Sequence, residues 1–143
     1  MVRLGLLLVM MLAAAGWRPV DPVDIARVMG LRPPSSQAVA ERAAEEFVRQ
    51  RLDYPSNTEL TFRPAVRGYL GKAGDPDDAY AAIWMCGTVR VGPTVNTAAW
   101  MVAFDRKQPD LVHDGDIGFG RRQRFTGASC TEIYRDGILV FGR

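Results

Sequence analysis

Residues that enzymes and nucleic-acid binders depend on are scarce in this chain. Its 143 residues include one histidine and two cysteines, and 18 basic residues nearly balance 16 acidic ones, which gives a net charge of +2. So small a charge excludes the strongly basic surface of a typical nucleic-acid binder. The sequence contains no phosphate-binding, dinucleotide-binding or nucleophile-elbow motif. We therefore expect no cofactor, no metal and no nucleic-acid partner, and a non-enzymatic protein is favoured.

The chain begins with an apolar segment. Arg3 precedes a run of apolar residues and glycine over 4–15, in which Ala13 and Ala15 form an A-x-A site. This pattern is typical of a secretory signal peptide, here residues 1–15. The run is shorter than the roughly 20 residues of a transmembrane helix. We predict a bacterial periplasmic or secreted protein. The alternative is an uncleaved inner-membrane anchor, and only that alternative predicts contact with the membrane.

The two cysteines agree with export. Cys86 and Cys130 lie 44 positions apart and neither belongs to a C-x-x-C pair. In an oxidising compartment two cysteines usually pair, so we predict a disulfide between them. Closing a loop of this size stabilises a fold by about 4 kcal/mol at most in the chain-entropy model. A reactive thiol, a metal ligand or two free buried cysteines are the alternatives.

Residues 16–35 are predicted to form a proline-rich linker before a single domain at 36–143. Four prolines lie between positions 18 and 36, and this segment either packs on the domain or only tethers it. The domain is expected to begin with a helix over 36–52. The apolar residues there recur at spacings of three and four: Ala40, Ala43, Ala44, Phe47 and Val48.

After this helix the pattern indicates strands. Residues 80–91 alternate between two apolar faces, which predicts a central strand covered on both sides. Residues 98–104 are its expected hairpin partner. The remaining expectations are short strands at 59–63, 118–125 and 138–141, loops at 68–78 and 105–116, and either a helical turn or a strand at 129–137.

These elements define an α+β domain in which an N-terminal amphipathic helix packs on a small antiparallel sheet of three to five strands. Trp84 and Trp100 fall on neighbouring strands. They are expected to fill the core, and lining a ligand pocket is the alternative.

One candidate site is the polar group His113, Asp114 and Asp116. A histidine beside carboxylates suits a general base or part of a metal site, and it would be the centre of any small hydrolase activity. The Asp114–Gly115 pair is also a turn signal, which favours an exposed loop instead. The acidic run at 75–78 lacks the spacing of a calcium-binding loop and is interpreted as solvated.

A second candidate is a basic patch of Arg121, Arg122 and Arg124. Phe119 and Phe125 flank these arginines, and basic residues among aromatics can bind an anionic partner. On the strand expected here, the simpler interpretation is a charged edge that prevents aggregation.

Two segments of the chain resemble a group of small exported bacterial and prophage proteins. They are LDYPSNT at 52–58 and WMCGTV at 84–89. In that group a helix runs into an L-x-D-P-x-S-like segment, and a later strand ends in C-G-x-V-N. Here Tyr54 is an insertion and Arg90 replaces the asparagine. The resemblance covers about residues 45–105, and it implies an exported protein with this order of elements but no catalytic residue.

The sequence therefore predicts a small exported, non-enzymatic domain that binds an envelope protein or a cell-wall component. The alternatives are a membrane-tethered accessory subunit of an envelope complex, or a small hydrolase or inhibitor with a site near His113.

Overall fold

The structure, a computed structural model, describes residues 30–52, 58–70, 81–92 and 96–142. The predicted signal peptide, most of the linker and the acidic run at 75–78 lie outside these residues. The described part contains two helices and six strands. In chain order they are α3 (Gln37–Arg51), β1 (Thr58–Phe62), β2 (Val66–Tyr69), β3 (Ala81–Val91), β4 (Asn96–Phe104), β5 (Val112–Gly118), α4 (Arg121–Asp136) and β6 (Ile138–Leu139).

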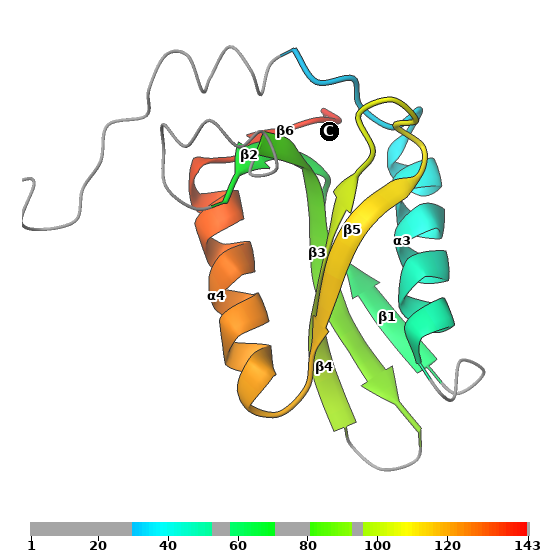
Figure 1. The fold of residues 1–143 in the computed structure, drawn as a ribbon, viewed down its shortest axis with the longest axis vertical. Helices are drawn as coiled ribbons and strands as arrows, with labels where there is room; N and C mark the ends of the chain where they lie inside the picture. The colour runs from blue at the N-terminus through cyan, green and yellow to red at the C-terminus, as the bar shows by residue number, and fades with distance from the viewer. Residues whose placement is uncertain (1–29, 53–57, 71–80, 93–95, 143) are drawn as a thin grey trace, which may run out of the picture.

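All six strands belong to one antiparallel sheet. The order across it is β5-β4-β3-β2-β6, and β1 pairs with β3 beside β2. Both β1 and β2 therefore lie along the same edge of β3, where β2 pairs with the first half and β1 with the second. Figure 1 shows α3 on one face of the sheet and α4 on the other. The fold is thus α+β, with the sheet between two helices.

The predicted helix over 36–52 is present as α3. Ser36 caps its first turn, because the Ser36 hydroxyl accepts a hydrogen bond of 3.1 Å from the amide of Val39. Its buried residues are the small side chains of Ala40, Ala44 and Val48. These pack on the sheet face formed by alternate residues of β3 and β4, a cluster that includes Ile83, Met85, Val89, Trp100 and Val102.

Both tryptophans are in the core, as expected, but they belong to different clusters. Trp100 is fully buried among the residues packed under α3, and its indole donates to the Thr88 carbonyl at 3.0 Å. Trp84 lies in the second cluster with Ile133 of α4, and its indole donates to the Gly68 carbonyl at 3.1 Å. Each indole N–H therefore has a partner inside the fold.

Four expectations about the fold are wrong. Most of the segment predicted as a strand at 118–125 belongs to a second helix, α4, which begins at Arg121 and ends at Asp136. The loop expected at 105–116 contains most of β5, and the loop expected from residue 68 begins inside β2. The sheet has six strands, more than the three to five predicted.

The last residues before α3 pack against the domain. Pro34 is buried, and the backbone N–H and hydroxyl of Ser35 both donate to the carboxylate of Asp110, at 2.7 and 2.8 Å. The Arg67 side chain also bonds to the Leu31 carbonyl. At residues 30–35, packing on the domain is therefore the correct alternative.

Candidate binding surface on helix α4

The inward face of α4 is fixed to the sheet by a covalent bond. Cys130 forms a disulfide with Cys86 at the centre of β3, as the sequence predicts. Thr126 and Ile133 lie one turn before and one turn after Cys130, and both are buried. These three positions recur at helical spacing, so one face of α4 is committed to the sheet.

Tyr134 holds the same helix to the corner between β1 and β2. Its hydroxyl donates to the Pro64 carbonyl at 2.6 Å and accepts from the Cys86 amide at 3.2 Å. The guanidinium of Arg63 lies 3.7 Å from the centre of its ring. Burial raises the pKa of the Tyr134 phenol above its ordinary value, and the hydrogen bond from Cys86 and the charge of Arg63 oppose that rise.

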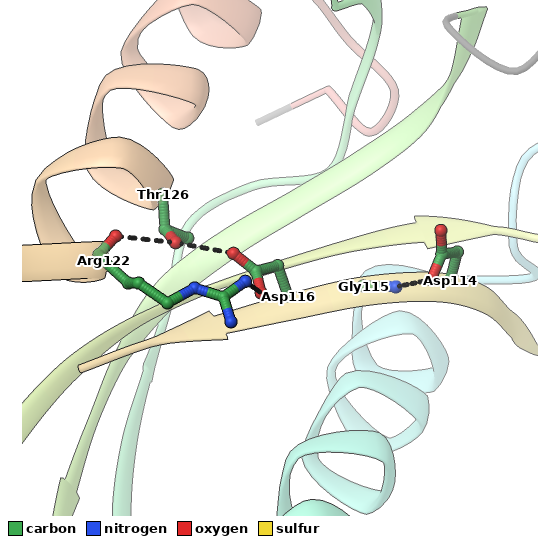
Figure 2. A network of polar contacts seen from close by, with 5 residues as sticks. All are labelled: Asp114, Gly115, Asp116, Arg122 and Thr126. Carbon is green, nitrogen blue, oxygen red and sulfur yellow. Dashed lines mark hydrogen bonds and ion pairs between the residues drawn. The ribbon is translucent and has the colours of Figure 1, made fainter.

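The beginning of α4 is anchored to β5 through Asp116. One Asp116 oxygen accepts from Arg122 at 2.8 Å, and the other accepts from the buried Thr126 hydroxyl at 2.9 Å. Figure 2 shows both side chains of α4 pointing toward Asp116, with Asp114 further along β5. Arg122 is therefore partly neutralised and serves to position the helix.

A tight connection brings β5 and α4 together. A side chain at Gly118 would collide with Thr126 and with the Arg122 backbone, so only glycine permits this approach. Gly120 has φ +58° and occupies the N-cap position without a side-chain hydrogen bond. The first turn of α4 is thus fixed in place but has no side-chain cap.

The outward side of this turn carries what we call the α4 patch: Phe119, Arg121, Arg124 and Phe125. Phe125 is 74% exposed and Phe119 is 40% exposed, which is unusual for aromatic side chains in so small a domain. Arg121 and Arg124 are also exposed, and neither has an ion-pair partner among the residues that the structure describes. Two arginines without an ion-pair partner in the described part of the chain and one highly exposed aromatic ring therefore lie on the first turns of α4, and the partly exposed Phe119 precedes them in the chain.

The charges of the patch do not serve helix stability. The first turn of α4 contains no acidic residue, although the positive end of the helix dipole favours acidic residues and disfavours arginine. The three arginines of the predicted patch therefore lie on a helix, where Arg122 bonds to Asp116 of β5 and the other two are exposed. The expectation that it forms a charged edge strand is wrong.

The structure does not assemble the polar candidate site. His113 lies on β5 and is highly exposed, with its Nδ1 3.5 Å from an Asp105 oxygen. Asp114 accepts from the amide of Gly115, whereas Asp116 is bound to α4. The three residues thus enter separate interactions, and they lie on a strand where the sequence favours a loop.

A shallow cavity of about 220 Å³ lies on the other side of the sheet. It is between α3 and the start of β5, and its lining includes Phe47, Leu111 and Val112. It contains one carboxylate, from Glu46, and none of the predicted site residues. Within the described ranges there is no cluster of three metal-ligating side chains, and neither helix is long and apolar enough to span a membrane.

No known protein family, curated protein or solved structure matches this chain. The chemistry of its own residues is therefore the basis for a functional inference. The α4 patch was visible in the sequence as interleaved arginine and phenylalanine, but its geometry was not. The helical spacing of its buried positions was hidden because Thr126 is polar and because Cys130 and Ile133 alone do not define a helical period.

Proposed function

We propose that this chain is a small exported, non-enzymatic domain that binds a component of the bacterial envelope through the α4 patch. The observation that carries the proposal is Phe125, a large apolar ring left 74% exposed beside two unpaired arginines. Exposed aromatics and arginines are the residue types enriched at the energetic centres of binding surfaces. The Cys86–Cys130 disulfide supports an oxidising compartment.

The rigidity of α4 supports a binding role over a catalytic one. The disulfide, the Asp116 contacts and the Tyr134 hydroxyl fix the helix at its middle, beginning and end. A surface held in this way loses little conformational entropy when a partner binds. By contrast, the residues around His113 do not converge on a point where a substrate could be held.

Crosslinking in intact cells tests the proposal. A diazirine amino acid replaces Ala128, which is exposed and lies within one helical turn of Arg124 and Phe125. We expect light-dependent adducts, detected as added mass of any kind, and we expect them to disappear in the variant Arg121→Glu/Arg124→Glu. The same probe at Arg42, an exposed residue of α3, is the matched control. Equal adducts at both positions, or none at 128, would contradict the proposal.

Export is tested separately by the mass of the intact protein from the cell envelope. Cleavage after Ala15 predicts a chain that begins at Gly16. A chain that retains residues 1–15 would favour the membrane-tethered accessory subunit instead. Free Cys86 and Cys130 thiols in freshly isolated protein would contradict the exported assignment.

A further inference from the structure

We infer that the occupant of the α4 patch is an anionic phospholipid bilayer, which the folded domain contacts through Phe119, Phe125, Arg121 and Arg124. This inference rests on the proposed function and names the envelope component. It is distinct from anchoring by the N-terminal apolar segment, because it assigns membrane contact to the folded domain itself.

The shape of the patch favours a bilayer. Side chains as exposed as Phe125 project from the surface instead of lining a groove, whereas peptides and small ligands are usually held in concave sites. The cavity that the structure does contain lies beside α3, on the opposite side of the sheet. Figure 1 places the first turn of α4 toward one end of the molecule.

The chemistry of the patch matches an anionic interface. Aromatic rings beside arginines are the composition of helices that lie at the boundary between headgroups and acyl chains. Arginines at such a surface are attracted to anionic lipids. The distribution of charge is also one-sided, because four arginines against two acids leave α4 with +2, whereas three arginines and three glutamates leave α3 neutral.

The test uses the full chain with vesicles of phosphatidylcholine alone or with about one-third phosphatidylglycerol. We expect tighter binding to the anionic vesicles, and we expect added salt to weaken it. Reversing both charges in Arg121→Glu/Arg124→Glu should weaken this binding about 30-fold or more. Phe125→Ala should weaken it about tenfold.

A charge-matched variant controls for net charge. Arg32→Glu/Arg42→Glu changes the net charge by the same amount at exposed positions away from α4, and it should leave binding nearly unchanged. Hydrogen exchange gives a local readout, in which anionic vesicles should slow the amides of residues 119–128. This readout separates the patch from the apolar N-terminal segment, which all variants share.

Three results would overturn the lipid assignment: equal losses in both double variants, binding that ignores lipid charge, or no slowing at 119–128. The mass of the adducts from residue 128 then separates this failure from failure of the proposed function. Patch-dependent protein adducts would keep the binding role and replace the lipid with an acidic protein partner. Absence of any adduct would contradict both the lipid assignment and the proposed binding function.

Discussion

Arg121 and Arg124 stand where the electrostatics of their own helix disfavour them. The N-terminal turn of α4 presents the positive end of the helix dipole, and its N-cap, Gly120, offers no side-chain acceptor. Residues that oppose local stability in this way are typical of surfaces kept for function. Stability and binding should therefore respond to substitution in opposite directions.

Arg121→Glu tests this opposition directly. The substitution places a negative charge at the positive end of α4 and should raise the free energy of unfolding by about 0.5 to 1 kcal/mol while it weakens patch-dependent binding. Arg135→Glu, in the last turn of the same helix, is the matched control and should lower stability by a similar amount. Urea unfolding of both variants measures this, and a loss of stability in Arg121→Glu would show that the arginine supports the fold.

At the scale of elements, the space around two glycines shows how closely β3 and α4 are packed by their neighbours. Gly87 of β3 lies against the Thr61 carbonyl and the Trp100 ring, so a side chain there has no room. A Cβ added at Gly127 of α4 would have no heavy atom within 4 Å apart from its chain neighbours and the backbone of its own helix. Gly87→Ala should therefore cost at least about 2 kcal/mol, whereas Gly127→Ala should stabilise the protein by about 0.5 to 1 kcal/mol. Chemical denaturation measures the change in the free energy of unfolding for each variant. Changes of the same sign in both variants would contradict the packing described.

The disulfide makes a separate contribution to the same elements. Removing it in Cys86→Ala/Cys130→Ala frees a loop of 44 residues and should lower the free energy of unfolding by about 3 to 4 kcal/mol. The oxidised wild type is the reference, and the reduced wild type should lose a similar amount. Hydrogen exchange should accelerate more in α4 than in β3 and β4, since the sheet keeps its other contacts. A loss below about 1 kcal/mol would mean that Tyr134 and Thr126 suffice to hold α4.

The elements that could be predicted are those whose burial is carried by apolar side chains. Helix α3 and strands β3 and β4 followed from their periodicity. Helix α4 did not, because its buried face contains the polar Thr126 and only two apolar residues, and because Gly127 weakens the helical pattern. The sequence of β5 indicated a loop because this strand lies at the edge of the sheet and is polar. It also contains Gly115, a turn-forming residue that is needed here because the Phe47 ring occupies the space of a side chain. The arginines of the α4 patch were identifiable by type, whereas their direction depended on tertiary structure.

For the molecule as a whole, the net charge of +2 is unevenly distributed between the two helices that cover the sheet. Helix α3 is electrically balanced and borders the shallow cavity beside β5, whereas α4 carries an excess of arginine and the 74% exposed ring of Phe125. An anionic surface would therefore orient the domain with α4 toward it and α3 away. That orientation leaves the segment at 30–35 and its contact with Asp110 free to respond to solution conditions.

Acid should loosen this segment before the sheet unfolds. The hydroxyl and amide of Ser35 hold the pKa of Asp110 below the ordinary aspartate value, so the contact stabilises the fold fully above about pH 4 and is lost as pH falls through the lowered pKa. In nuclear magnetic resonance spectra the Ser35 amide should titrate with a midpoint below about 3.9. In Asp110→Asn it should cease to titrate, while the amides of Lys107 and Gln108, bound to Asp105, should still do so. A Ser35 midpoint at the ordinary aspartate value would mean that residues 30–35 are not held by this carboxylate. The segment would then be fixed to the domain by contacts such as the buried Pro34, the packing of Leu31 on the core and the Arg67–Leu31 bond.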